Sequence, residues 1–129
     1  YSTHGIQTPM SWDVENTDEF GDWFIDLGNS DQDAIRFSVG LLADKGPNLR
    51  FPHSSGINNS RHSHMRELRI QSGGKPLRVF YAFDPRRSAI LLIGGDKTGD
   101  ARFYERMIPV ADELYDVYLQ ELKEEGLIK

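Results

Sequence analysis

The sequence contains no cysteine and no long apolar run, and both absences narrow the range of functions. Without cysteine the chain has no disulfides, thiolate nucleophiles or thiolate metal sites, which suits the reducing cytoplasm. No apolar segment reaches the roughly 18 residues that a transmembrane helix needs. Hydrophobic residues nevertheless make up 38% of the 129 residues, enough for the core of one domain. We therefore expect a cytoplasmic globular protein with no membrane partner.

Several common catalytic motifs are also missing. There is no Gly-x-Ser-x-Gly nucleophile elbow and no pair of carboxylates framed by apolar residues, as glycosidases require. Residues 94–98 (GGDKT) do not form a phosphate-binding loop, because Asp96 stands where that loop needs a glycine before the lysine. His62 and His64 share one face of an extended segment, but no third zinc ligand lies nearby. A metal site is therefore not predicted, and His64 stays open as a general base.

Charge is distributed unevenly along the chain. Residues 1–60 contain three Lys/Arg against nine Asp/Glu, residues 61–106 contain ten against five, and residues 107–129 contain two against six. A basic central segment between acidic flanks indicates an anion-binding surface, although the net charge is −5. The alternative is that these cations are solvated or form ion pairs, as Arg69 could with Glu67 or Asp84.

The spacing of apolar residues predicts an α+β fold with the order β-α-α-β-β-β-α. We expect residues 1–9 to be an expression-tag remnant or disordered, and residues 10–129 to form a single domain. Short connections predict that the last three strands form an antiparallel meander, and Pro109 is expected to kink or restart the last helix. The expected strands are 12–16, 65–71, 77–84 and 89–93, and the expected helices are 17–28 (capped by Thr17), 30–46 (capped by Ser30) and 99–125.

Side-chain alternation places basic residues on one face of this meander. All three helices are expected to pack on the sheet and to leave its other face open, and Arg69 and Arg78 point to this open face together with Glu67. Lys97 follows the last strand, where the paired glycines 94–95 are expected to let the chain turn sharply beside a substrate. Tyr104 begins the last helix. Arginine pairs with phosphate oxygens and stays charged, and tyrosine can stack on a base or relay a proton, so this set suits RNA cleavage.

Other basic residues of the central segment are candidates for RNA binding. Arg66 is out of phase with Arg69, so it joins the same face only if the strand begins with a bulge. The complete set of RNA-binding candidates is Arg61, His64, Arg66, Arg86, Arg87 and Arg102.

Several segments, taken in order, resemble a known family. They are residues 12–14 (WDV), 19–24 (EFGDWF), 65–69 (MRELR), 78–85 (RVFYAFDP), 95–97 (GDK) with Tyr104, and 108–112 (IPVAD). Their order and spacing resemble the RelE/HigB-like toxins of bacterial toxin–antitoxin systems, in particular the phage-derived HigB-like branch. The resemblance extends over nearly all of residues 10–125.

This resemblance implies a ribosome-dependent mRNA endonuclease, or mRNA interferase, that enters the ribosomal A site and inhibits translation. It implies metal-free attack by the ribose 2′-hydroxyl, no cofactor, and a partner antitoxin with a helix-turn-helix DNA-binding domain. Arg78 matches the residue that contacts the scissile phosphate, Lys97 the basic residue after the last strand, and Tyr104 the stacking or proton-transferring tyrosine. Arg66 and Arg69 match the basic strand before them.

The chain also departs from the family pattern. It is acidic overall where the family's members are basic, and Asp96 and Thr98 flank Lys97 where other members carry a second basic residue. Two alternatives therefore stand beside the nuclease hypothesis. One is a ParE-like inhibitor of DNA gyrase on the same fold, and the other is a catalytically degenerate protein that only binds an antitoxin.

Overall fold

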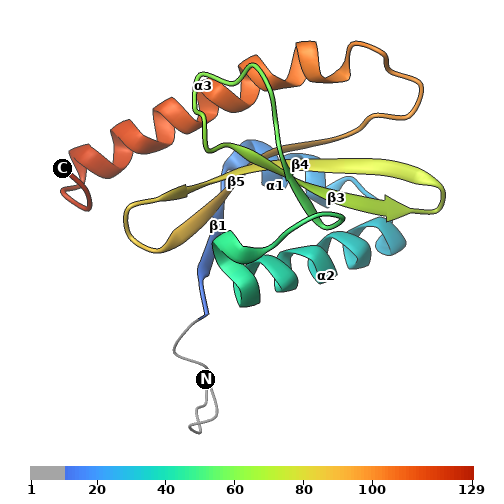
Figure 1. Ribbon diagram of the computed structural model, residues 1–129, viewed down its shortest axis with the longest axis horizontal. Helices are drawn as coiled ribbons and strands as arrows, with labels where there is room; N and C mark the ends of the chain where they lie inside the picture. The colour runs from blue at the N-terminus through green and yellow to red at the C-terminus, as the bar shows by residue number, and fades with distance from the viewer. Residues whose placement is uncertain (1–10) are drawn as a thin grey trace, which may run out of the picture.

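The computed structural model describes residues 11–129, in which a five-stranded sheet carries helices on both faces (Figure 1). The elements are β1 (Asp13–Asn16), α1 (Asp18–Ile25), α2 (Asn29–Lys45), the 3-10 helix η1 (Gly46–Asn48), β2 (Ser54–Gly56), β3 (Arg66–Ser72), β4 (Lys75–Asp84), β5 (Ser88–Asp96) and α3 (Phe103–Glu124). The predicted α+β class is confirmed, and β2 is an additional strand inside the segment expected to be a loop. The prediction for residues 1–9 lies outside the described residues.

The strands are arranged in the order β1-β5-β4-β3-β2. The antiparallel meander β3-β4-β5 is confirmed, and β1 adds to it as a parallel edge strand beside β5. At the other edge β2 pairs antiparallel with β3, so that Ser55 lies opposite Glu67. Because β5 lies inside the sheet, its residues 89–92 are apolar and buried on both faces.

The first two helices cover one face of the sheet. The Thr17 hydroxyl caps α1 by accepting a hydrogen bond from the Phe20 amide (3.0 Å), and it donates one to the Leu92 carbonyl of β5 (2.7 Å). The cap therefore also ties α1 to the sheet. The prediction that Ser30 caps α2 is wrong: Gly28 is the N-cap, because its carbonyl already accepts the Gln32 amide (3.0 Å).

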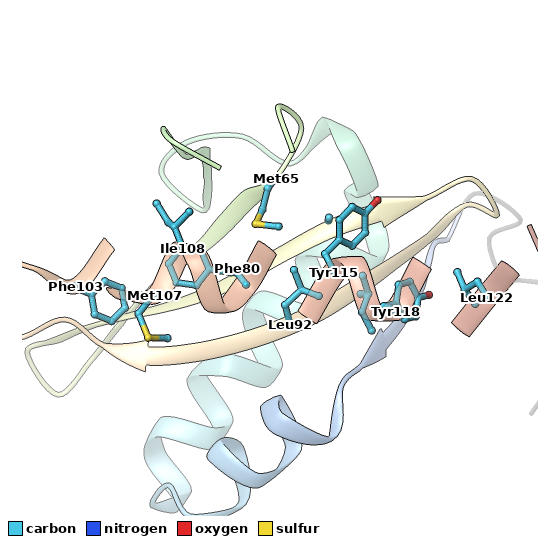
Figure 2. Close-up of a cluster of buried hydrophobic side chains, with 12 residues drawn as sticks. Met65, Phe80, Leu92, Phe103, Met107, Ile108, Tyr115, Tyr118 and Leu122 are labelled. Atoms are coloured by element: carbon cyan, nitrogen blue, oxygen red, sulfur yellow. The ribbon is translucent and has the colours of Figure 1, made fainter. Parts of the chain in front are cut away.

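Helix α3 covers part of the opposite face, where its inward side chains pack on β4 and β5 (Figure 2). The prediction that this face is open is therefore wrong, because the apolar side of α3 is buried there and not beside α1 and α2. Helix α3 continues through Pro109 as one helix, so of the two predicted effects of this residue the restart does not occur, and the kink stays a prediction. Proline removes one amide donor from the helix. The buried side chains Met107, Ile108 and Ala111 hold the helix against the sheet on both sides of this position. Within residues 11–129, no helix combines the length and the apolar character that crossing a membrane requires.

Gly94 and Gly95 belong to β5 and are not turn residues, so the prediction of a sharp turn there is wrong. A Cβ atom on Gly94 would come within 2.2 Å of the Trp23 ring of α1, and one on Gly95 within 2.8 Å of the Phe103 ring of α3. The two glycines therefore make room for aromatic rings that pack on opposite faces of the strand. The contact with Phe103 fixes the start of α3 against the sheet.

Candidate active site

A cleft of about 760 Å³ lies beside the first turns of α3. It is bounded by β2 and the loop after it, by β3, and by α3. The residues that line it are Ser55, Gly56, Ile57, Asn58, Asn59, Glu67, Arg69, Tyr104, Glu105, Ile108 and Pro109.

Glu67 forms the centre of this site, although only 3% of the residue is exposed. Its Oε1 accepts a hydrogen bond from the Tyr104 hydroxyl (2.7 Å), and its Oε2 accepts one from the Ser55 hydroxyl (2.8 Å). Arg69 Nη1 lies 3.4 Å from Oε2, and Arg78 Nε lies 3.7 Å from Oε1. One carboxylate therefore joins side chains from β2, β3, β4 and α3.

The register of β3 and β4 explains why an acidic residue stands here. Arg69 and Arg78 lie directly opposite each other, an arrangement that is unfavourable for two like charges. Glu67 is two residues before Arg69 on the same strand, so its carboxylate reaches both guanidinium groups from the same face. The carboxylate offsets the repulsion and keeps two arginines close together.

Arg78 is buried beneath this carboxylate, with 5% of the residue exposed. Its Nη1 donates to the Leu77 carbonyl (3.0 Å), whereas its Nε has no hydrogen-bond partner. Buried donors are nearly always satisfied, and Arg86 Nε is the other exception among residues 11–129, so the feature alone does not mark a functional site. Arg78 thus supplies positive charge and unused donor capacity directly under the cleft.

Tyr104 is suited to donate a proton. Burial raises the pKa of its hydroxyl above the ordinary value, and the hydrogen bond to Glu67 raises it further, while Arg78 acts in the opposite direction. The phenol therefore stays protonated at neutral pH. Lys97 Nζ lies 5.6 Å from the centre of the same ring, a cation–π contact that places a third positive charge at the site.

Asp96 shapes the turn that carries Lys97. Its Oδ1 accepts the Thr98 amide (2.9 Å) and the Thr98 hydroxyl (2.6 Å), and these hydrogen bonds hold the pKa of Asp96 below its usual value. Among residues 11–129 no ion pair joins Asp96 to Lys97. Asp96 thus fixes the backbone on both sides of the lysine, and the lysine's charge remains available.

Three of the four catalytic candidates, Arg69, Arg78 and Tyr104, contact Glu67, and the fourth, Lys97, lies over the Tyr104 ring. Of the RNA-binding candidates, Arg102 lies nearest, exposed at the start of α3 and 3.1 Å from Glu105, which lines the cleft.

The other RNA-binding candidates lie elsewhere. Arg66 projects from the face of β3 opposite to Arg69, where its Nε donates to the Ser54 hydroxyl (3.0 Å). Two of the remaining four contact α3: Arg61 pairs with Asp116, and His64 Nε2 is 3.2 Å from the Tyr115 hydroxyl. The other two lie in the turn between β4 and β5. There Arg86 pairs with Asp84 (2.9 Å), and the Arg87 guanidinium lies 4.4 Å from the centre of the Trp12 ring.

The sequence indicated Glu67 only as a possible ion-pair partner of Arg69. The sequence contains a clearer indication of its role. Glu67 is the one acidic residue in the segment 61–80, and it lies two residues before Arg69, so both side chains point to the same face of the strand. Ser55 gave no signal, because the strand β2 that positions it was expected to be a loop.

Comparison with known proteins gives a match between residues 22–116 and the family described as Phage derived protein Gp49-like (DUF891). Two proteins of Mycobacterium tuberculosis strain H37Rv are also similar. The candidate toxin HigB3 is 39% identical over 98 residues, which is 75% of this chain and 84% of that protein. The candidate toxin HigB2 is 33% identical over 104 residues, 79% of this chain, which spans about half (52%) of that protein's length. The match to the family includes the whole Glu67 site.

Proposed function

The chain belongs to the phage-derived Gp49-like family and is a HigB-like toxin, and from this premise we propose that it cleaves mRNA on the ribosome as the toxin of a bacterial toxin–antitoxin system. The observation that carries the nuclease proposal is one cleft lined by a carboxylate, a protonated phenol and an arginine, with two further cations, Arg78 and Lys97, next to these groups. These are the groups needed to cleave RNA through its own ribose hydroxyl.

Cleavage by this route makes one bond and breaks one. Glu67 takes the proton of the 2′-hydroxyl, and the 2′-oxygen attacks the adjacent phosphorus. The P–O5′ bond breaks, and Tyr104 gives its proton to the departing 5′-oxygen. The products are a 2′,3′-cyclic phosphate and a 5′-hydroxyl, and no other reactant is required.

The cations stabilise the charge that develops on the phosphorane. Arg69 lines the cleft with 30% of its side chain exposed and can meet phosphate oxygens there, and the half-buried Lys97 adds its charge from beside the Tyr104 ring. Arg78 adds its charge from below, in a site where little water screens it. A guanidinium suits this task because it remains charged and presents several donors in one plane.

The hydrogen bond between Tyr104 and Glu67 restores the site after each cut. After cleavage Glu67 holds the proton and Tyr104 has lost one. Their oxygens are 2.7 Å apart in the free protein, so the proton can return directly from the carboxyl to the phenolate. The site can therefore act repeatedly.

A toxin of this kind needs a partner that silences it. We propose a cognate antitoxin with a helix-turn-helix DNA-binding domain, together with the ribosome and its mRNA as the working partners in the cytoplasm. The acidic net charge is compatible with the ribosome because the cations at the cleft lie close together, whereas acidic residues are numerous in α1 and in the C-terminal half of α3.

The proposal is tested by inducing the protein in bacteria while recording growth and mapping mRNA ends on translated messages. We expect growth arrest with new mRNA ends inside reading frames, and loss of both in Arg78→Ala, Lys97→Ala and Tyr104→Ala. Arg36→Ala is a matched control, because Arg36 forms an exposed ion pair with Asp33 on α2 and should stay toxic.

Other outcomes would contradict the proposal. If all three cleft variants stayed as toxic as the wild type, the assignment of the site would fail. Trapped DNA breaks with intact mRNA would instead indicate a gyrase inhibitor. Normal growth on induction would indicate a protein that only binds an antitoxin.

A further inference from the structure

An exposed aromatic ring lies at the border of the cleft. Phe51, in the loop before β2, exposes 69% of its surface and belongs to neither of the two hydrophobic cores. The Arg69 guanidinium lies over its ring, with Cζ 5.0 Å from the ring centre. The same loop is tied to β3, because the Arg69 amide donates to the His53 carbonyl (2.9 Å). The ring is thus held in place while remaining open to solvent.

We propose that Phe51, backed by Arg69, is a stacking subsite for an RNA nucleobase beside the scissile phosphate. This inference rests on the proposed function, and it adds a substrate contact that neither the strand pattern nor the family resemblance indicates. An aromatic ring backed by a guanidinium is a surface on which nucleobases stack.

The position of Arg69 connects this ring to the chemistry. Its guanidinium contacts the Phe51 ring on one side and the Glu67 carboxylate on the other, at 3.4 Å. A nucleobase is joined to its own phosphate through a single ribose. A phosphate held by Arg69 beside Glu67 therefore brings an adjacent base within reach of the Phe51 ring.

Stacking on Phe51 would hold the substrate without strict base recognition. Every base has a π-face, so all four bases can stack on the ring. A preference for one base over another then arises from the strength of stacking. Purines present the larger face. We expect mRNA cleavage to favour sites with a purine at the nucleotide that stacks on Phe51.

The experiment measures cleavage of a defined mRNA on purified programmed ribosomes by Phe51→Ala, Phe51→Leu and Phe51→Trp. We expect the alanine and leucine variants to cut about tenfold more slowly and to lose the purine preference. The tryptophan variant should retain both. Phe37→Ala is the matched control, because Phe37 is similarly exposed (67%) but lies on α2, which packs on the other face of the sheet, and it should behave as the wild type.

The leucine variant separates stacking from a purely structural role. Leucine still covers the Arg69 side chain but has no π-face, so cleavage by Phe51→Leu at the wild-type rate with the wild-type base preference would overturn the inference. Failure of the wild-type protein to cut any mRNA would overturn the proposed function and this subsite with it. The two failures are therefore distinguishable.

Fluorescence gives a second measurement that does not depend on turnover. The Phe51→Trp protein is added to ribosomes carrying an mRNA with deoxyribose at the cleavage site, which that chemistry cannot cut. The fluorescence that the introduced tryptophan adds to that of the wild-type protein should be quenched when a base stacks on its ring. Unchanged emission in a complex that forms would contradict the proposal.

Discussion

Two clusters, each made of a carboxylate, an arginine and a tyrosine, lie between α3 and the sheet, and they differ in how closely the carboxylate is paired and whether it lines a cleft. The Glu67 cluster is near the start of α3, and the Asp84 cluster is nearer its end. Their members are Glu67, Arg78 and Tyr104 in the first and Asp84, Arg86 and Tyr118 in the second.

The carboxylate of the Asp84 cluster is shielded from solvent. The Asp84 side chain is fully buried (0%) and accepts the Arg86 amide (2.7 Å), the Arg86 guanidinium (2.9 Å) and the Tyr118 hydroxyl (2.6 Å). Burial alone would raise the pKa of Asp84, but these hydrogen bonds outweigh it and the pKa lies below the usual value. Arg86 also reaches Glu15 of β1 (3.2 Å), so the cluster joins three elements. We assign it a structural role.

The Glu67 cluster is open by comparison. Its carboxylate lines a cleft, and its two ion pairs are longer at 3.4 and 3.7 Å. A buried Nε without a hydrogen-bond partner occurs in both clusters, at Arg78 and at Arg86. The comparison shows that residue types alone do not distinguish a site from a structural ion pair. What distinguishes them is whether the carboxylate lines a cleft that a substrate can enter, and how closely its arginine partners approach it.

The largest expected effect is on cleavage by Tyr104→Phe. Removing the hydroxyl removes the proposed acid, and general acid–base groups contribute roughly 10²–10⁴-fold to rate. We expect cleavage on programmed ribosomes to slow about a thousandfold. Tyr118→Phe should cut at the wild-type rate per folded molecule, and a similar loss in both variants would break the distinction between the clusters.

The next largest effect is on the stability of Asp84→Asn. Removing one partner of a buried ion pair leaves the other uncompensated, so we expect the free energy of unfolding to fall by about 3 kcal/mol. Urea denaturation followed by circular dichroism measures this. Stability equal to the wild type would show that the Asp84 cluster is not structural.

Tyr118→Phe should cost less than Asp84→Asn. It removes a hydroxyl that donates to Asp84 (2.6 Å), lies 3.2 Å from Glu15 Oε1 and accepts from Arg86 (2.9 Å), and it leaves the ring packed in the core, so the expected loss is about 1.5–2 kcal/mol. The same denaturation series checks it. Tyr104→Phe should lose less than this, because Glu67 keeps the Ser55 hydroxyl and borders a solvated cleft.

The smallest effect is on stability at alkaline pH. Burial, and then Asp84, raises the pKa of Tyr118 above its ordinary value of 10.0. Its neutral form is therefore favoured by folding, and the associated stability is present below pH 10 and lost as pH rises through the folded pKa. Thermal melts from pH 8 to pH 11 should show a shallower decline for Tyr118→Phe, and an identical decline would contradict the assignment.

The sequence predicted the strands and their faces well because strand alternation is a local property. It placed Arg69, Arg78 and Glu67 on one face, as the structure has them. Contacts that depend on the packing of α3 could not be predicted in the same way. Tyr104 meets Glu67 because the neighbouring Phe103 ring packs on Gly95. The sequence shows the pair of glycines, but it does not show whether they form a turn or make room for an aromatic ring.

The most direct test of the account is the rate and product of mRNA cleavage by Glu67→Gln on programmed ribosomes, measured beside Asp84→Asn. We predict that the wild type and folded Asp84→Asn leave a 2′,3′-cyclic phosphate and a 5′-hydroxyl at the same rate. Glu67→Gln should cut at least a hundredfold more slowly while remaining folded. Equal rates for Glu67→Gln and the wild type would contradict the claim that the open cluster is the catalytic one.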